Sequence, residues 1–428
     1  MDTIFALATA QGKAGVAVIR VSGPSAHSIS ARLSGKTIPS RGMIFSEIKK
    51  DSGEVLDEAL LLSFSAPNSF TGEDVVELQL HGSTAVVSAV LTELSSMTDA
   101  RLADPGEFTR RALENGKLDL TQVEGLADLI DAETDAQRKQ AQAALAGGLG
   151  KLAERWRQDL IRAASLIEVT IDFADEDVPV DVTPEVTTLL QGVLKDVRNQ
   201  CDGVHIAERI REGFEVAIVG APNAGKSTLL NALAGRQAAI TSEYAGTTRD
   251  VIEVRMDLGG LPVTLLDTAG LRETEDHVEG IGIALARDRA AAADIRVFLA
   301  EQGETLDVAF CEGDVQFLPK ADMRDDPTGA ISGKSGFGVD VLISHVASTL
   351  KNRATHAGLA SRARHRDALN YALSSLSQAL SVLSQGPEFY DLAAEDMRSA
   401  IRALEMLVGR INVENLLDEI FSSFCLGK

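Results

Sequence analysis

Cysteines, long apolar runs and a leader-like N-terminus are scarce or absent in this 428-residue chain. Its three cysteines, Cys201, Cys311 and Cys425, lie far apart, so neither a disulfide framework nor a paired-cysteine metal site is expected. No apolar run approaches the ~20 residues that a membrane span requires, and the first residues lack the basic stretch and apolar core of a signal peptide. We therefore expect a cytoplasmic protein without a membrane partner.

Positive charge is also in deficit. The chain has 41 lysines and arginines against 63 acidic residues, a formal net charge of -22. Such a surface disfavours non-specific contact with nucleic acid, because phosphates would meet mostly negative side chains. If RNA is the substrate, we expect a partner protein to supply much of the contact.

The first part of the chain has alternating strand and helix signals. Apolar, β-branched runs predict strands at 15–21, 59–64 and 75–80, and apolar residues at helical spacing predict a helix at 84–94. The composition then becomes that of a helix bundle from Gly116 onward. The breaks expected between its helices, at 147–150 and 177–184, are rich in glycine or proline, and the last helix should end near Arg211.

Strand character returns near Glu215, and the α/β pattern continues to about Leu350. Beyond it, amphipathic patterns predict helices at 359–383 and 394–420. The simplest arrangement inserts the α/β module between two halves of one helical domain, which gives a multidomain fold of class α/β plus α. The predicted segments are an α+β domain at 1–116, a first helical part at 117–211, the α/β module at 212–355 and a second helical part at 356–428.

Residues 220–227, Gly-Ala-Pro-Asn-Ala-Gly-Lys-Ser, form the strongest local motif. They follow the strand candidate 216–219 and precede a helical segment, which is the context of a phosphate-binding loop. The glycines let backbone amides point at phosphate oxygens, and the helix offers its positive end. Lys226 would contact the β- and γ-phosphates and Ser227 would bind Mg²⁺. The flanking strand and helix disfavour the alternative, a glycine-rich turn without a ligand.

Two downstream segments fit the same site. Residues 246–250, Gly-Thr-Thr-Arg-Asp, are typical of a first switch, in which Thr248 would complete the Mg²⁺ shell. Residues 267–270, Asp-Thr-Ala-Gly, follow the strand candidate 263–266 and would place a carboxylate near the metal. Either segment alone is also compatible with an ordinary turn, and their order after the loop favours nucleotide binding.

Base recognition departs from the usual pattern. GTPases usually carry Asn-Lys-x-Asp, whereas residues 319–322 here read Pro-Lys-Ala-Asp. Asp322 can accept hydrogen bonds from N1 and N2 of guanine, and the stem of Lys320 can pack on the base. Because Pro319 cannot supply the missing amide, we expect weaker nucleotide binding, which Pro319→Asn should tighten. Residues 332–334, Ser-Gly-Lys, fit a loop that closes over the base or an ordinary strand-to-helix turn.

The water-positioning group also differs. Ras-like enzymes place Gln directly after Asp-x-x-Gly, and this chain has Leu271, which cannot orient water. Glu273, Glu275 and Glu279 are candidates for that role, although each is also compatible with a solvated acidic loop.

Together these motifs closely resemble the MnmE/TrmE-type tRNA modification GTPases. The resemblance spans essentially the whole chain, and its most specific parts lie outside the phosphate-binding loop. They are residues 15–23, 67–74, 105–108, 116–120 and the terminal Phe-Cys-Leu-Gly-Lys at 424–428. The resemblance implies a folate-binding N-terminal domain that forms a homodimer, a discontinuous helical domain and an inserted P-loop GTPase domain, also called the G domain.

The resemblance further implies a partner and cofactors. Members of this family form a heterotetramer with a flavin-dependent protein, MnmG/GidA, and install a (carboxymethyl)aminomethyl group at C5 of the wobble uridine of certain tRNAs. The one-carbon donor is tetrahydrofolate in its 5-formyl or 5,10-methylene form. The cofactors of GTP hydrolysis are Mg²⁺ and K⁺, and we expect the partner to hold most of the tRNA.

Residue roles carry over where motifs match. Asn223 resembles the family's K⁺ ligand, and Glu279 resembles its water-orienting acid. Ser242, Tyr244 and Thr247 would complete the K⁺ site, in part through backbone carbonyls. The nucleotide set is Asn223, Ala224, Gly225, Lys226, Ser227, Thr228, Ser242, Thr247, Thr248, Asp267, Thr268, Ala269, Gly270, Lys320, Asp322, Ser332, Gly333 and Lys334.

The folate set implied by the resemblance is Arg20, Glu77, Lys117 and Lys428. A carboxylate would pair with the N–H donors of the pterin, and the basic groups would bind the carboxylated tail. Cys425 would lie near the one-carbon unit, without an assigned role. Two other classes stay open: an assembly or checkpoint GTPase, which the N-terminal motifs disfavour, and a P-loop ATPase, which Asp322 disfavours.

Overall fold

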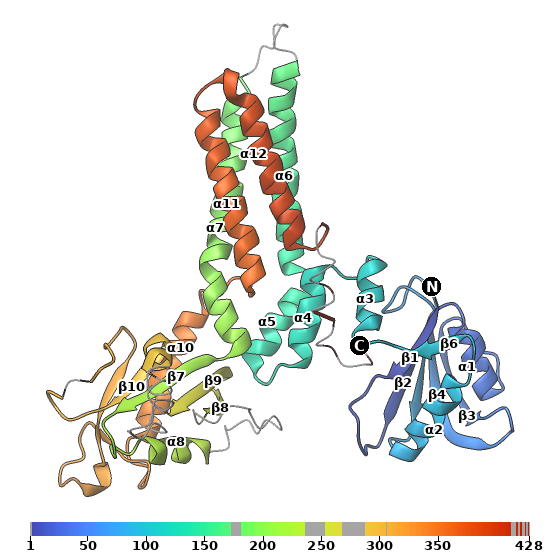
Figure 1. Cartoon of the computed structure of the whole chain (residues 1–428), viewed down its shortest axis with the longest axis horizontal. Helices are drawn as coiled ribbons and strands as arrows, with labels where there is room; N and C mark the ends of the chain where they lie inside the picture. Colours follow the sequence, from blue (N-terminus) through green and yellow to red (C-terminus); the bar gives the residue numbers. More distant parts are fainter. Residues whose placement is uncertain are drawn as a thin grey trace, which may run out of the picture. The chain divides into compact units, whose positions relative to one another are not determined.

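The structure, a computed structural model, describes residues 2–172, 181–235, 253–267, 287–304 and 306–411, together with 417, 420, 421, 424 and 427. The chain forms two compact units, Met1–Ala127 with Val408–Lys428, and Asp128–Leu407. Figure 1 shows their elements. Within the described ranges, no helix combines the length and apolar character needed to cross a bilayer. The four-segment division predicted from the sequence stays a prediction.

A six-stranded sheet of order β3-β4-β5-β2-β1-β6 organises the first unit. All of its neighbouring strands are antiparallel except β1 and β6. Its strands are β1 (Thr3–Leu7), β2 (Ala17–Ser22), β3 (Gly42–Lys49), β4 (Val55–Phe64), β5 (Val75–Leu80) and β6 (Ala100–Leu102). The three strands predicted from apolar runs are therefore confirmed, within a few residues at their ends.

Helices cover the two faces of this sheet unequally. On one face, α1 (Ala26–Ser34) and α2 (Thr84–Ser95) bury their apolar sides against β1, β2, β4 and β5. On the other face, α3 (Glu107–Glu114) packs Phe108 against Ile4 and Ala6 of β1. The C-terminal segment joins the same unit, where Phe421 and Phe424 pack with Val123 of α4 (Leu120–Ile130).

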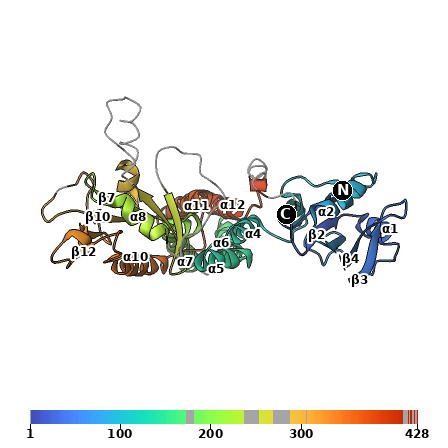
Figure 2. The same cartoon turned by 90° about the horizontal axis from the view of Figure 1, so that it is seen from below.

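Four long helices form the bundle of the second unit. They are α6 (Gly148–Asp172), α7 (Thr183–Glu212), α11 (Ala363–Leu383) and α12 (Tyr390–Leu407). Figure 1 draws them side by side, and Figure 2 views them nearly along their axes. Each buries an apolar stripe at helical spacing, such as Leu369, Leu376 and Leu383 on α11. The short helix α5 (Asp135–Leu145) begins with a capping box in which Thr134 and Gln137 exchange hydrogen bonds.

The helices predicted at 359–383 and 394–420 were wrong at three of their four ends. The first begins at Ala363, because the backbone of Arg362 is extended (φ -137, ψ 152). The Leu359 amide, which precedes this helix, donates to the Gln200 side-chain oxygen at 2.8 Å. The second begins at Tyr390, and it ends at Leu407 because Gly409 is left-handed (φ 80). Any side chain at Gly409 would meet the Leu120 Cβ at 2.5 Å, a contact that periodicity cannot reveal.

A second six-stranded sheet, of order β12-β11-β10-β7-β9-β8, forms the inserted α/β module. Only β8 and β9 pair antiparallel. Its strands are β7 (Phe214–Gly220), β8 (Glu253–Leu258), β9 (Leu261–Asp267), β10 (Ile295–Leu299), β11 (Val315–Pro319) and β12 (Ala330–Ile331). Helices α8 (Lys226–Ala234) and α10 (Val339–Ala354) bury their apolar sides against one face. Strand β7 lies between β9 and β10, so its carboxyl end is the topological switch point where ligands bind in such sheets.

The connection between β10 and β11 is short and has no helix or strand among its described residues. Phe310 of this connection contacts Phe298 of β10, with ring centroids 5.4 Å apart. Strands β10 and β11 still pair in parallel. The sheet is therefore continuous across this short connection, up to the strand that carries the base motif.

Candidate functional site

The loop between β7 and α8 has the backbone of a phosphate-binding turn. Asn223 (φ 64) and Gly225 (φ 96) are both left-handed, a geometry that lets successive amides face one anion. At Gly220, a Cβ would lie 2.6 Å from the Leu299 carbonyl oxygen, so β10 approaches too closely for a side chain. Helix α8 begins at Lys226 and directs its N-terminal amides toward the loop.

Lys226 lies over this loop. Its Nζ donates to the carbonyl oxygens of Gly220 at 2.7 Å and Ala221 at 2.9 Å, and the residue is only 6% exposed. Burial lowers the pKa of Lys226, and the nearby Asp267 carboxylate partly opposes this shift. Asp267 is itself buried at the carboxyl end of β9. The ammonium and the carboxylate are thus placed at neighbouring strand ends, at the edge where β7 turns into the loop.

The base motif begins where β11 ends. Asn223 and Lys320 are the two non-glycine residues with positive φ in the described chain, and Lys320 has φ 58. Such backbone costs about 1–2 kcal/mol and persists where its surroundings enforce it. Ser332 Oγ donates to Asp322 Oδ1 at 2.6 Å, and this bond lowers the pKa of Asp322. Asp322 therefore presents an ionised acceptor at neutral pH.

Residues 332–334 pack between the base motif and the phosphate-binding helix. The buried Ser332 hydroxyl accepts hydrogen bonds from the Lys334 and Ser335 amides at 3.2 and 3.3 Å. A Cβ on Gly333 would lie 2.5 Å from the Thr228 carbonyl oxygen in α8. The structure thus brings together, at one edge of the sheet, the predicted nucleotide residues that it describes.

Several predicted residues lie outside the described ranges. They are Ser242, Tyr244, Thr247, Thr248, Thr268, Ala269, Gly270, Glu273, Glu275, Glu279, Cys425 and Lys428. Across the described residues, no group of three or more His, Cys, Asp or Glu side chains could hold a metal ion alone.

In the first unit, Arg20 of β2 and Glu77 of β5 face each other in register. Arg20 Nε and Nη2 each lie 2.9 Å from Glu77 Oε1. The guanidinium also lies 5.4 Å from the Phe70 ring centroid and 5.6 Å from that of Phe108. A Cβ on Gly72 would lie 3.2 Å from Lys117 Cε, which places Lys117 beside the loop that carries Phe70.

Sequence reasoning missed the two aromatic rings as site residues. Both occur in the family motifs, at 67–74 and 105–108, and only the fold shows that they flank one arginine. The C-terminal segment also reaches this sheet, because a Cβ on Gly427 would lie 2.0 Å from the Leu7 carbonyl oxygen of β1. Strand β1 pairs with β2, with Ala6 opposite Arg20.

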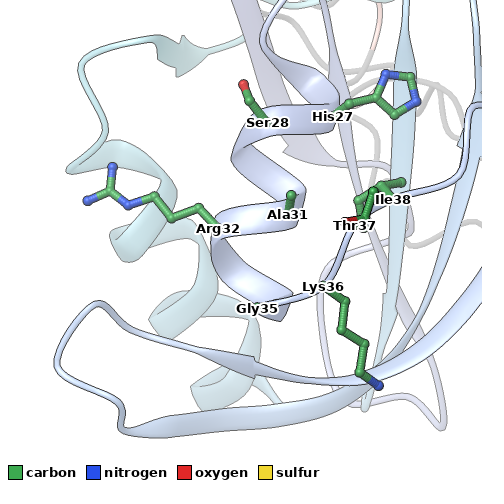
Figure 3. A pocket seen from close by; sticks show the side chains of 8 residues that line it. All are labelled: His27, Ser28, Ala31, Arg32, Gly35, Lys36, Thr37 and Ile38. Atoms are coloured by element: carbon green, nitrogen blue, oxygen red, sulfur yellow. The ribbon is translucent and has the colours of Figure 1, made fainter.

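A hollow of about 500 Å³ lies beside α1 (Figure 3). Its arginine and lysine already have partners: Arg32 pairs with Asp51, and Lys36 Nζ donates to the Phe45 carbonyl oxygen at 2.7 Å. Figure 3 shows Arg32 and Lys36 pointing away from each other. We therefore assign no ligand to this hollow.

The parallel sheet, the loop at its switch point and the carboxylate base motif define a P-loop GTPase. Two family models match the chain: GTP-binding protein TrmE N-terminus at residues 3–117, and MnmE helical domain at residues 120–425. The chain is 75% identical over 428 residues to the tRNA modification GTPase MnmE of Ruegeria sp. (strain TM1040) and 64% identical to that of Ruegeria pomeroyi. Each alignment covers the full length of this chain and of the relative. It therefore belongs to the MnmE family of tRNA modification GTPases.

A solved structure, a GTP-binding protein from Sulfolobus solfataricus in complex with GDP, matches 46% of this chain and 67% of its own, with 14% identity and a TM-score of 0.24. At that score we draw nothing from it. The family membership rests on the sequence relatives and the family models, and the enzyme is accordingly a GTP hydrolase.

Proposed function

We propose that this protein is a K⁺-stimulated GTPase that acts with a flavin-dependent partner of the MnmG/GidA type. Together they use a one-carbon unit of tetrahydrofolate to install a (carboxymethyl)aminomethyl group at C5 of the wobble uridine of certain tRNAs. The observation that carries the proposal is the aromatic-flanked Arg20–Glu77 pair, which lies in the same chain as a P-loop. A simple GTPase switch has no use for such a second site.

The geometry of the phosphate-binding loop supports the nucleotide half of the proposal. Loop amides and Lys226 bind the phosphates, and Asp322 accepts from N1 and N2 of guanine. Ser227 is exposed at the start of α8, where its hydroxyl suits Mg²⁺, with Thr248 as a second ligand. Asn223, with Ser242, Tyr244 and Thr247, is proposed to hold K⁺. Bound cations would neutralise the charge that develops on the transferred phosphate, while Glu279 positions the attacking water.

The folate half rests on the chemistry of Glu77. Arg20 occupies its Oε1, and no described residue donates to its Oε2, so that oxygen can accept from the N–H donors of a pterin. Phe70, 36% exposed, offers a ring face on which a flat heterocycle can stack. Lys117 and Lys428 are proposed to bind the carboxylated tail of the folate.

The homodimer is proposed to form through the face of the first sheet that carries this pair. Met43 and Phe45 of β3 are 68% and 62% exposed. Met43 lies opposite Leu62 of β4, and Leu62 lies opposite Glu77, so these side chains share one face. Exposed apolar side chains clustered on one sheet face are typical of an interface. A second copy covering them would enclose the Arg20–Glu77 pair.

The tRNA is proposed to lie mostly on the flavoprotein in a heterotetramer, because the net charge of -22 repels a polyanion. On this account the proteins meet in the cytoplasm, and the present chain contributes the GTPase and the folate. Tight, strongly salt-dependent tRNA binding by this chain alone would contradict that division of labour.

The proposal is tested in cells that lack the chain and receive variants of it. Wild type should restore the wobble-uridine modification, Arg20→Ala should not, and the matched control Arg32→Ala should, because Arg32 pairs with Asp51 outside the site. Purified wild type should hydrolyse GTP faster in K⁺ than in Na⁺ and should retain 5-formyl-tetrahydrofolate. If cells that lack the chain still carry the wobble-uridine modification, the result would favour the rival, an assembly or checkpoint GTPase.

A further inference from the structure

The base-recognition turn is fixed at its start by an arginine. Pro319, the last residue of β11, has no N–H and no polar side-chain atom, so only its carbonyl can be held by a hydrogen bond. Arg324 Nε donates to that carbonyl oxygen at 2.8 Å. The same guanidinium pairs through Nη2 with Glu301, in the connection that follows β10. Arg324 thus joins the first residue of the base motif to the neighbouring connection.

The held carbonyl governs the conformation of the next residue. The peptide plane between Pro319 and Lys320 is one of the two planes that define φ of Lys320, which is 58°. Non-glycine residues rarely adopt this conformation, so the surroundings must hold it. The turn then closes with the Met323 amide donating to the Lys320 carbonyl oxygen at 2.9 Å. Asp322 lies inside this turn, and Ser332 bonds it from the other side.

We infer that Arg324 is a positioning residue for guanine recognition: by fixing the Pro319 carbonyl, it holds Lys320 left-handed and keeps Asp322 directed at the base. The inference rests on the proposed role of Asp322 in binding guanine. Arginine suits the task because its planar fork reaches two acceptors in fixed geometry, which a lysine ammonium on a flexible stem does not. Arg324 therefore fixes a turn that the side chain at position 319 cannot fix, because proline has no polar side-chain atom.

The test compares full-length wild type with Arg324→Ala, Arg324→Lys, Glu301→Ala and Asp322→Ala. Arg353→Ala is the matched control, because Arg353 likewise makes two hydrogen bonds, to the backbone carbonyls of Asp294 and Glu312, but near the amino ends of the same two strands. Calorimetry measures the Kd for GDP and for inosine diphosphate, which lacks the N2 amino group. Steady-state kinetics measures kcat and KM for GTP.

We expect Arg324→Ala to raise the Kd for GDP by about tenfold, the loss of one charge-assisted hydrogen bond. It should also raise KM with little change in kcat, and lower the preference for GDP over inosine diphosphate, because N2 is read by Asp322. Arg324→Lys should show the same rise in the Kd for GDP and the same loss of preference as Arg324→Ala. Glu301→Ala should change both quantities in the same direction, but less. Arg353→Ala should lower the melting temperature and leave both Kd values unchanged.

Two failures are distinguishable. If Asp322→Ala leaves guanine preference unchanged, the proposed base site is wrong. If Asp322→Ala abolishes that preference while Arg324→Ala and Glu301→Ala both bind like wild type, the base site stands and the positioning role is overturned. If Arg324→Ala does not fold, Arg324→Lys and Glu301→Ala decide the question. The lysine keeps a positive charge without the planar fork, and Glu301→Ala leaves Arg324 bonded to the Pro319 carbonyl alone.

Discussion

Gly333 lies against the backbone of Thr228, where a Cβ would come within 2.5 Å of the Thr228 carbonyl oxygen. Thr228 belongs to the helix that follows the phosphate-binding loop, and Gly333 belongs to the loop that adjoins the base motif. The two ends of a nucleotide site are thus in direct contact through one glycine. Space, and not backbone strain, is what this position requires.

Gly333→Ala should therefore weaken nucleotide binding. The added methyl group must displace the loop from α8, and with it the Ser332 hydroxyl that bonds Asp322. Overpacking of this kind costs about 1–3 kcal/mol, which predicts a rise in the Kd for GDP of about tenfold or more. Gly192→Ala in α7 is the control, because nothing lies within 4 Å of that Cβ and alanine favours helix. It should raise the melting temperature; equal GDP affinity in Gly333→Ala and wild type would contradict the contact.

Replacement of Lys226 should affect stability and nucleotide binding in opposite directions. Burial lowers its pKa below the usual 10.5, so the folded protein carries the charge at a cost. That cost is present in full below the lowered pKa and disappears as pH rises to the unfolded value. Lys226→Met should thus match or exceed the melting temperature of nucleotide-free wild type at pH 7, with the gap closing near pH 10. Its Kd for GDP should rise by about 100-fold, through the lost phosphate contacts. A large loss of stability in Lys226→Met would contradict this account.

The phosphate-binding loop could be predicted from sequence because its function resides in consecutive residues. Most strands and helices could also be predicted, because burial repeats along the chain at a period of two or 3.6 residues. The end of α12 could not, since it depends on Gly409 meeting Leu120 in another part of the chain. The roles of Arg324, Phe70 and Phe108 could not be predicted for the same reason, because only the folded structure shows what each side chain contacts.

Glu107 supports the first unit through a buried charge network. Its Oε1 receives hydrogen bonds from Arg101 at 2.6 Å and from Arg111 at 2.8 Å. Burial raises the pKa of Glu107. The hydrogen bonds from Arg101, the Asp104 amide and Arg111 together lower it by more, so the net pKa lies below 4.5. The resulting stability is present above pH 4.5 and is lost as pH falls through the lowered folded value.

Glu107→Gln should accordingly cost about 3 kcal/mol at pH 7, since it leaves Arg111 buried beside one fewer charge. Hydrogen exchange of the β1 amides measures this locally, and the deficit should shrink as pH falls through the lowered pKa of Glu107. Glu47→Gln on β3 is the control, because Glu47 pairs with Lys49 in solvent and should change nothing. An undiminished deficit at low pH would mean that packing, not charge, is responsible.

The last prediction concerns Gly427, whose Cβ position lies 2.0 Å from the Leu7 carbonyl oxygen. Only glycine permits the C-terminal segment to approach β1 this closely, and β1 lies next to the strand that carries Arg20. Because Lys428 follows directly, Gly427→Ala should move a proposed folate ligand away from the Arg20–Glu77 pair, which is proposed to bind the pterin. We expect retention of 5-formyl-tetrahydrofolate to fall by about tenfold, the loss of one charge-assisted contact, while GTP hydrolysis is unchanged. Gly15→Ala, with nothing within 4 Å of its Cβ, should retain folate like wild type. If Gly427→Ala also retains it, the C-terminus does not belong to the folate site, and Arg20, Glu77 and Lys117 must bind the ligand without Lys428.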